Sequence, residues 1–328
     1  MKRTISVAPM MDCTDRHDRF FLRLISKNVM LYTEMIATKS ALHGDRKKIL
    51  GYSPEEKPLA LQVGGSDKKE LAEVSKIAEN MGYDEININL GCPSKKVQKN
   101  KFGACLMKEP DLVSECINEM VNSCNIPVTA KTRIGFDNIE DFEYLNKFIL
   151  KMKEAGCKTF ILHARKAILK GLTPKQNLNI PKLNYEMVYK IKKVNTDLKI
   201  IINGGITKIE EIKNHLKKCD GVMIGRAIYQ NPFFLVDIER EIFNNKNNPT
   251  RDYVVKELLK YLEKEIKVGT KVNHVMRHAV GLYHGQTGSK NWKRYLSDNM
   301  MARDSDFQKA KHIMTIVQNN EKVNQKIL

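Results

Sequence analysis

The chain has 328 residues, of which 42% are hydrophobic and 29% are charged, and its formal net charge is +18. A chain of this length can bury a large core and has room for one large domain, or for one large and one small domain. It contains no apolar run of the roughly eighteen residues that a membrane span needs, and its N-terminal residues lack the pattern of a secretory signal. We therefore expect a cytoplasmic protein with no membrane contact.

The seven cysteines are odd in number and form no CxxC pair, so we expect free thiols and no metal site. The positive charge is unevenly distributed. No carboxylate occurs from Ile266 to Ser297, although this window holds four lysines, two arginines, three histidines and three aromatic residues. A solvated basic surface would also give this composition, but cationic side chains interleaved with aromatic ones favour binding to the backbone and exposed bases of a nucleic acid.

Short strand-like segments alternate with helical patterns over about the first 230 residues. The predicted strands span residues 5–10, 29–36, 59–65, 85–92, 127–134, 159–165, 199–206 and 221–227. The predicted helices include residues 67–81, 111–124, 139–155, 184–194 and 207–217. This alternation predicts an α/β fold, a (β/α)8 TIM barrel. A doubly wound sheet is the alternative, but it usually has fewer strands and a G-x-G-x-x-G turn after the first one, where this chain has "APMMDCTDR".

The pattern changes at "NNKNNPT" (244–250), a turn-rich stretch that reads as a linker. Beyond it only helical periodicity occurs, at residues 253–268, 270–283, 291–302 and 305–320. We expect a barrel domain over residues 1–243 and an all-α helical bundle over residues 244–328. In the second of these helices the packed stripe should be Val272, Val275, Met276 and Ala279. The opposite side should hold Lys271, His274, Arg277 and His278.

Polar residues stand at the C-terminal ends of most predicted strands, where barrels place their active sites. They include Glu34, Gln62, Asn87, Asn89, Cys92, Lys131, Arg133, His163 and Arg165. Glycine turns follow the seventh strand, at Asn203-Gly204-Gly205, and the eighth, at Gly225-Arg226. Turns of this kind at these two strands predict a phosphate-binding site, although each is also a simple tight turn. FMN suits the site better than a dinucleotide, because no G-x-G-x-x-G follows a strand.

Strand alternation directs Lys131 toward the predicted barrel mouth. Its ammonium would then lie beside the flavin edge that becomes negative on reduction, or it would form an ion pair with Glu34. The neutral amide of Gln62 could satisfy donors and acceptors of the flavin ring. His163 and Arg165, two residues apart, share the same face of their strand.

Several motifs in the expected order resemble the tRNA-dihydrouridine synthase family, and especially its bacterial A-type subgroup. They are "APMMDCTDRHDRFFLRL", "LYTEM", "LALQVGGSD", "GYDEININLGCPSKKVQKNKFGACLM", "VTAKTRIG", "HARKAILKGLTPKQN", "INGGI" and "DGVMIGRAIYQNP". The later stretch "RHAVGLYHGQTGSKNWKRYLS" resembles that subgroup's helical domain. The chain departs from the subgroup at Cys13, where tryptophan is frequent.

The resemblance implies an oxidoreductase that reduces the C5–C6 double bond of D-loop uridines in tRNA, at positions 20 and 20a. NADPH would reduce FMN, the flavin would deliver hydride to C6, and Cys92 would protonate C5. The implied FMN contacts are Pro9, Met10, Met11, Gln62, Lys131, His163, Asn203, Gly204, Gly205, Gly225 and Arg226. The implied tRNA contacts are Asn89 and Arg165 at the uracil, and Lys175, Asn177, Arg277 and Arg294 elsewhere.

Two other functions fit part of the pattern. An FMN barrel dehydrogenase acting on a free pyrimidine would not need the +18 charge or the carboxylate-free helical region. A catalytically silent RNA-binding barrel would not need Cys92, Lys131 and His163 together with the glycine turns. A monomer is adequate for the function that the family resemblance implies. The second cysteine of the quoted motif, Cys105, is expected to be a small packed residue rather than a reagent.

Overall fold

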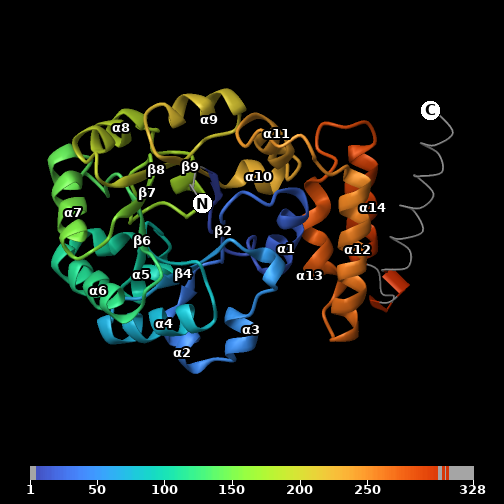
Figure 1. Cartoon of the computed structure of the whole chain (residues 1–328), viewed down its shortest axis with the longest axis horizontal. Coiled ribbons are helices and arrows are strands. Elements are labelled where there is room, and N and C mark those ends of the chain that lie inside the picture. Colours follow the sequence, from blue (N-terminus) through green and yellow to red (C-terminus); the bar gives the residue numbers. More distant parts are fainter. Residues whose placement is uncertain (1–4, 302–304, 307, 310–328) are drawn as a thin grey trace. The chain divides into compact units, whose positions relative to one another are not determined.

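The computed structural model describes residues 5–301, 305–306 and 308–309. The chain folds as two compact units (Figure 1). The first comprises residues 1–12 and 29–225, and the second comprises residues 13–28 and 226–328. The segment 13–28 therefore leaves the barrel unit and belongs with the C-terminal helices, an excursion that no composition change in the sequence marks.

The first unit is built on a ring of parallel strands. Their order is β1-β9-β8-β7-β6-β5-β4-β2, with β3 paired to β4. The strands are β1 (Ile5–Val7), β2 (Leu31–Tyr32), β3 (Ile36–Ala37), β4 (Leu59–Gly64), β5 (Glu85–Leu90), β6 (Val128–Arg133), β7 (Thr159–His163), β8 (Lys199–Asn203) and β9 (Gly221–Ile224). Backbone hydrogen bonds from Val7 to Met30 and from Met30 to Ile5 close the ring. The predicted (β/α)8 barrel is thus confirmed.

Apart from the predicted strand 29–36, each strand is shorter than predicted at its C-terminal end, where the chain turns into the loops of the barrel mouth. The segment predicted as one strand over 29–36 is interrupted, and its two parts, β2 and β3, both pair with β4. Polar side chains near these ends form hydrogen bonds with backbone groups of the loops, and the backbone hydrogen bonds between strands stop there. The hydroxyl of Thr33, for example, donates to the carbonyl of Glu34 at 2.7 Å.

Helices surround the ring on its outer side (Figure 1). The long ones are α4 (Lys68–Asn80), α6 (Pro110–Ser123), α7 (Phe142–Glu154), α8 (Tyr185–Val194) and α9 (Ile209–Leu216). The short ones are α2 (Thr38–His43), α3 (Arg46–Leu50), α5 (Lys95–Lys99), η1 (Pro54–Glu56), η2 (Gly103–Lys108) and η3 (Gln176–Leu178). Asp67 caps α4 by accepting two backbone N–H groups, and Asp141 caps α7 in the same way with one.

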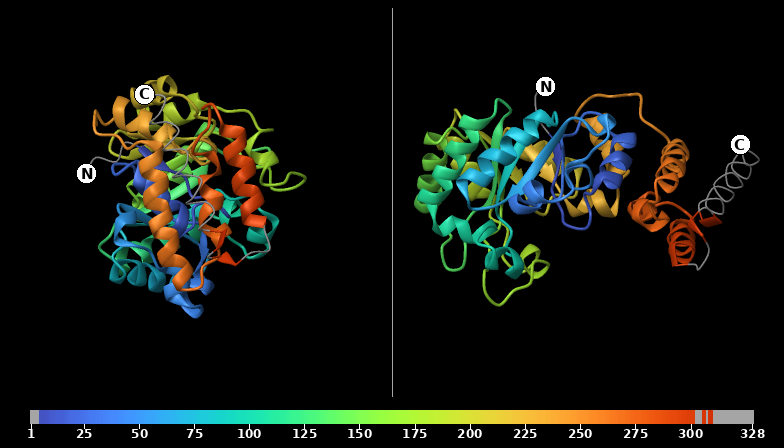
Figure 2. Two further views of the ribbon diagram at one scale, coloured as in Figure 1. Left: turned by 90° about the vertical axis from the view of Figure 1, so that its right-hand side faces the viewer. Right: turned by 90° about the horizontal axis from the view of Figure 1, so that it is seen from below.

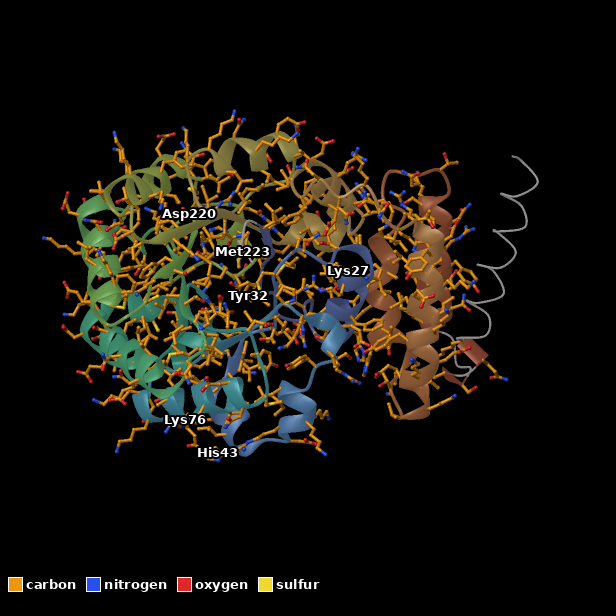
Figure 3. The ribbon with its side chains drawn as sticks, in the orientation of Figure 1. Lys27, Tyr32, His43, Lys76, Asp220 and Met223 are labelled. Atoms are coloured by element: carbon orange, nitrogen blue, oxygen red, sulfur yellow. The ribbon has the colours of Figure 1, made fainter. Side chains whose placement is uncertain are left out.

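The centre of the ring is apolar. A cluster of buried side chains from the strands and the residues that flank them fills it: Ala8, Met30, Tyr32, Ala60, Ile161, Ile201 and Met223. Figure 3 shows Tyr32 and Met223 within the ring, and His43 and Lys76 at its periphery. Buried polar side chains, among them Asn89, Arg133 and His163, stand toward the C-terminal ends of the strands, where barrels carry their active sites.

The described residues of the second unit form helices and no strand (Figure 2). Its elements are α1 (Arg16–Ile25), α10 (Arg226–Gln230), α11 (Phe234–Glu241), α12 (Arg251–Lys267), α13 (Val272–Met276), η4 (Arg277–Gly281) and α14 (Ser289–Met301). Phe20 of α1 stacks on Tyr261 of α12 with ring centroids 4.0 Å apart. The buried carboxylate of Glu239 accepts from the amide of Asn28 at 2.7 Å, which joins α11 to the end of the α1 segment. The predicted helix 305–320 lies almost wholly outside the described residues.

The predicted helix 270–283 differs from the structure in two respects. Its second half is the 3₁₀ segment η4, which ends at Gly281. Gly281 packs against the carbonyl of Gln230 so closely that an added Cβ would lie 2.6 Å away. The predicted apolar stripe is buried, but His278 is buried as well, contrary to expectation. Its Nε2 lies 3.1 Å from Asp15, an acidic partner 263 positions earlier that the helical pattern could not reveal.

Candidate active site

The strand register aligns the predicted site residues at three successive levels toward the barrel mouth. Gln62 pairs with Asn87, and two residues further along β5 Asn89 pairs with Lys131. At the uppermost level Arg133, His163 and Asn203 are register partners on β6, β7 and β8. All but Lys131 are at least nine-tenths buried, so these polar groups line the interior rather than an exposed rim.

A continuous series of side-chain hydrogen bonds, here called the ladder, rises from the interior toward the barrel mouth. It runs from Glu85 through Thr129, Asn87 and Gln62 to Asn89, with successive side-chain contacts of 2.7, 2.8, 2.8 and 2.9 Å. Every one of these residues is 8% exposed or less. Buried polar groups are costly unless they are paired, and here each of the five residues has at least one hydrogen-bond partner within the ladder.

Cys92 lies directly above the ladder in the Gly-Cys-Pro turn that follows β5. Its backbone N–H donates to Asn89 Oδ1 at 3.0 Å, and its carbonyl accepts from Ala104 at 2.9 Å. Gly103, with φ +78°, packs so closely on the turn that an added Cβ would lie 2.6 Å from the Cys92 carbonyl. Backbone contacts from both sides therefore hold the backbone of Cys92 in place.

Burial raises the pKa of the Cys92 thiol above its ordinary value, although the Ser94 backbone and the cations Arg133 and Lys131 oppose the shift. A thiol with a raised pKa keeps its proton at neutral pH. This is the state that a proton donor needs, in contrast to the thiolate of a nucleophilic cysteine. Cys105 also has a raised pKa through burial, but its thiol is engaged with the carbonyl of Phe102 at 3.1 Å.

Lys131 brings a cation into the mouth without a carboxylate partner among the described residues. The alternative ion pair with Glu34 is absent, and Glu34 instead accepts the backbone N–H of Asp12. Desolvation, assisted by repulsion from Arg133, lowers the pKa of Lys131 to about 7. Any anionic group that enters the mouth would stabilise the charged form of this side chain. We therefore interpret Lys131 as part of an anion-binding site.

Arg133 has a role that the sequence did not reveal. Its guanidinium donates to the carbonyls of Gly91, Lys166 and Asn177, at 3.0, 3.1 and 3.1 Å. It thereby ties the Cys92 turn to the long loop after β7. The only sequence signal was its parity with Lys131, which predicted the direction of the side chain but not its partners.

The β8 turn has the form of a phosphate cradle. Gly204 and Gly205 have φ values of +116° and +71°, which residues with a Cβ rarely adopt. An added Cβ on Gly204 would lie 3.2 Å from the His163 ring. Tyr185, which sequence reasoning missed, donates its hydroxyl to the Gly204 carbonyl at 2.7 Å and fixes the turn from the outer side. The amide of Asn203 donates to the Met223 carbonyl at 2.8 Å and joins β8 to β9.

Gly204→Ala is expected to lower the free energy of unfolding by about 1–3 kcal/mol through backbone strain, and to weaken FMN binding as the methyl group displaces His163. Gly269→Ala is the matched control, because Gly269 has φ +88° but no atom within 4 Å of the added Cβ. Thermal unfolding and fluorescence titration with FMN measure the two effects. Equal loss of FMN affinity in both variants would contradict the cradle.

The remaining residues predicted to contact FMN belong to the first and last barrel turns. Pro9 and Met10 are partly buried, whereas Met11 is 54% exposed. Gly225 approaches Met10, with an added Cβ 3.3 Å from its sulfur. Arg226 follows directly in the chain as the first residue of α10 and is assigned to the second unit.

The loop after β7 holds three of the predicted tRNA contacts, in different environments. Arg165 is 9% exposed and donates to the Pro181 carbonyl at 2.7 Å, while Lys175 is exposed. Asn177 departs from the expectation, because it is completely buried and its amide bonds the backbone of Ile168 in both directions, at 2.7 and 2.9 Å. It is therefore a loop-organising residue, and no part of its side chain is open to RNA.

The two predicted contacts in the second unit also differ from one another. Arg294 is exposed on α14. Arg277 is exposed as well, but it donates to Asp15 at 2.6 Å. Burial alone would raise the pKa of Asp15, yet its contacts with His278 and Arg277 hold that pKa far below the ordinary value, so part of the charge of Arg277 is already balanced.

The residues present fit FMN. The barrel mouth offers a cation without a carboxylate partner in Lys131, amide donors and acceptors in Gln62, and a glycine turn after β8 that could receive a phosphate. None of the described helices is long and apolar enough to cross a membrane, and no group of three or more potential metal ligands occurs among the described residues. This arrangement is the one expected of a barrel enzyme that would hold an anionic cofactor beside a thiol.

Comparison with known proteins gives the family. The profile described as dihydrouridine synthase matches residues 6–320. The chain is 49% identical over 298 residues to the tRNA-dihydrouridine(20/20a) synthase of Synechocystis, covering 90% of this chain and 89% of that protein. It is 48% identical over 314 residues to the protein of the same name from Escherichia coli K12, covering 95% and 91%. The chain belongs to the dihydrouridine synthase family, whose members are flavin-dependent oxidoreductases, and it is therefore an enzyme.

Proposed function

We propose that the chain is a tRNA-dihydrouridine(20/20a) synthase that uses FMN as cofactor and NADPH as reductant. The names of its relatives from Synechocystis, Escherichia coli and Shewanella oneidensis support the substrate and the positions. The observation that carries the chemistry is the partly buried, protonated thiol of Cys92 above the ladder and near Lys131. A reduction of a carbon–carbon double bond needs one hydride and one proton, and Cys92 supplies a group suited to the second.

Bound FMN would supply the hydride for C6 of the uracil ring. Cys92 would donate its proton to C5, and its raised pKa keeps that proton in place at neutral pH. Lys131 would stabilise negative charge at the mouth, and the β8 turn with His163 would hold the FMN phosphate. Asn89 and Arg165 would contact the base, and Arg133 would keep the Cys92 turn in register with the loop after β7.

The substrate would reach this site by extrusion of the target nucleotide from the folded tRNA, at a cost of roughly a few kcal/mol. Contacts to the phosphate backbone would compensate for this cost, and the excess of lysine and arginine behind the net charge of +18 supplies the cations for such contacts. Lys175 on the loop after β7, and Arg277 and Arg294 in the helical unit, are the proposed contacts. We assign the catalytic role to residues 1–243 and the tRNA-binding role to residues 244–328, acting in the cytoplasm as a monomer.

The direct test is to purify the protein, record its flavin spectrum and follow NADPH oxidation with an unmodified tRNA transcript. Mass spectrometry of the product tRNA should place dihydrouridine at positions 20 and 20a, the positions in the relatives' names. A free-pyrimidine dehydrogenase would instead reduce uracil in the absence of tRNA. Failure of the purified protein to bind FMN would rule out the proposed flavin mechanism.

Arg294→Gln is expected to weaken tRNA binding and to reduce the slope of log Kd against log salt concentration by about one, because one phosphate contact is lost. Arg240→Gln is the control, since Arg240 is also an exposed arginine of the helical unit but is paired with Asp237 at 2.8 Å. Filter-binding titrations at several salt concentrations measure both slopes. If the two variants gave the same slope, Arg294 would not be a tRNA contact.

A further inference from the structure

The ladder has a fixed direction at its upper end. Asn89 Oδ1 accepts the backbone N–H groups of Gly91 at 3.1 Å and of Cys92 at 3.0 Å. Backbone N–H groups only donate, so the opposite orientation of this amide would place its NH₂ group against two donors. The oxygen of Asn89 is therefore committed to the Cys92 turn, and its nitrogen must donate downward, to Gln62 at 2.9 Å.

The lower end imposes the same direction. Glu85 Oε1 accepts the hydroxyl of Thr129 at 2.7 Å and that of Tyr32 at 2.6 Å. Because Oε1 is the acceptor in both contacts, the single hydroxyl proton of Thr129 points to Glu85. The Thr129 oxygen is then left to accept from Asn87, at 2.8 Å, and the Asn87 oxygen accepts from Gln62. Donors point toward Glu85 at every step.

This direction determines what the upper residues can offer to a ligand. Asn89 has used both lone pairs of its oxygen and one of its two N–H groups, so only one N–H remains. Toward the mouth Asn89 is thus a hydrogen-bond donor and has no acceptor to offer. Gln62, by contrast, keeps one N–H and one lone pair, which suits a ring edge that carries both donors and acceptors.

We propose that Glu85, Thr129 and Asn87 are positioning residues that hold Asn89 as an obligate donor toward a carbonyl oxygen of the target base. None of the three reaches the base, because Gln62 and Asn89 stand between them and the mouth in the order of the ladder. Their effect is to exclude the flipped orientations of the ladder amides. In the flipped orientation Asn89 would no longer accept the backbone N–H groups of Gly91 and Cys92. The inference rests on the proposed function, since it takes a uracil ring as the partner of Asn89.

Thr129 and Tyr32 provide a matched pair for the test. Each donates one hydrogen bond to the same oxygen of Glu85, but only Thr129 continues the ladder upward. Thr129→Val breaks the ladder while keeping the shape of the side chain. Thr129→Ser keeps the hydroxyl, and Tyr32→Phe removes one hydrogen bond to Glu85 while leaving the ladder intact.

We expect Thr129→Val to slow dihydrouridine formation at saturating tRNA by roughly tenfold or more, as expected for misplaced reacting groups. Thr129→Ser should restore the rate to within about twofold of wild type, and Tyr32→Phe should stay in the same range, although its unfolding midpoint falls as far as that of Thr129→Val. Oxidation of the reduced holoenzyme by oxygen, which needs no base, should be equal in all variants. Equal rates for Thr129→Val and Tyr32→Phe, or no rescue by serine, would overturn the proposal.

Hydrogen exchange separates this inference from the proposed function. In the holoenzyme, exchange of the backbone amides of Gly91 and Cys92 should be faster in Thr129→Val but unchanged in Thr129→Ser and Tyr32→Phe. Unchanged exchange in Thr129→Val means that the ladder does not position Asn89, whatever the activity. Faster exchange supports the positioning role even if the wild-type protein formed no dihydrouridine, an outcome that would reject the proposed function itself.

Discussion

Cys92→Ser is expected to form dihydrouridine about 10²- to 10⁴-fold more slowly than wild type, the range attributed to a positioned acid. The serine hydroxyl is a far weaker acid than the thiol, and the backbone contacts that hold residue 92 involve only its N–H and carbonyl. The variant should therefore fold, bind FMN and bind tRNA normally. Rapid-mixing measurement of dihydrouridine formation, together with the flavin spectrum, tests both parts of this expectation.

Cys105→Ser is the matched control, because Cys105 lies thirteen residues beyond Cys92 and donates only to the carbonyl of Phe102. A serine can make the same hydrogen bond, so the rate should change by less than about twofold. Comparable losses in the two variants would show that either the assignment of Cys92 or the packing role of Cys105 is wrong.

The pH dependence gives a second test of the role of Cys92. A group that acts as an acid must be protonated, and burial raises the pKa of this thiol above its ordinary value. Activity limited by proton donation should therefore hold through neutral pH and fall only in the alkaline range, as the pH rises through the raised pKa. In Cys92→Ser this alkaline decline should disappear. A decline toward low pH instead would indicate that the thiolate is the active form.

The barrel could be predicted because its signals are local. Strand alternation placed Gln62, Asn87, Asn89 and Lys131 on one face, and register pairing brings them together as adjacent residues. The glycine turn after β8 was visible because positive φ values demand glycine. Each of these inferences needs only the period of a strand or the conformation of a single turn.

The features that the sequence did not reveal depend on contacts between distant residues. Tyr32 and Glu85 meet across 53 positions, and Arg133 reaches the carbonyl of Asn177 across 44. Neither contact could be predicted from residue spacing, because any polar side chain on the same face of the strand could have occupied these positions. Asn177 was predicted as an RNA contact from its motif, but its amide folds back onto its own loop. Motif position indicates that a residue matters without indicating whether it faces outward.

Lys131→Met is expected to increase the stability of the flavin-free protein while weakening FMN binding. The ammonium is desolvated and has no carboxylate partner among the described residues, which lowers its pKa to about 7. Methionine has a similar length and no charge to desolvate, so its burial is favourable where that of lysine is costly. Thermal unfolding of the flavin-free variant should show a higher midpoint at neutral pH than wild type. Lys153→Met, on the outer side of the barrel and paired with Asp197 at 2.8 Å, is the control and should not be stabilised.

The sign of the pH dependence distinguishes this explanation from a general packing effect. Between pH 7 and the ordinary lysine value of 10.5, the unfolded chain holds the proton that folded Lys131 has released. The stability of flavin-free wild type should therefore rise with pH across this window, and the advantage of Lys131→Met should be largest below pH 7 and shrink above it. FMN binding should follow the opposite course, because an anion near Lys131 favours the ammonium and takes up a proton as it binds. Affinity should fall as the pH rises above 7 in wild type but not in Lys131→Met, and the same pH slope in both proteins would exclude Lys131 from the FMN site.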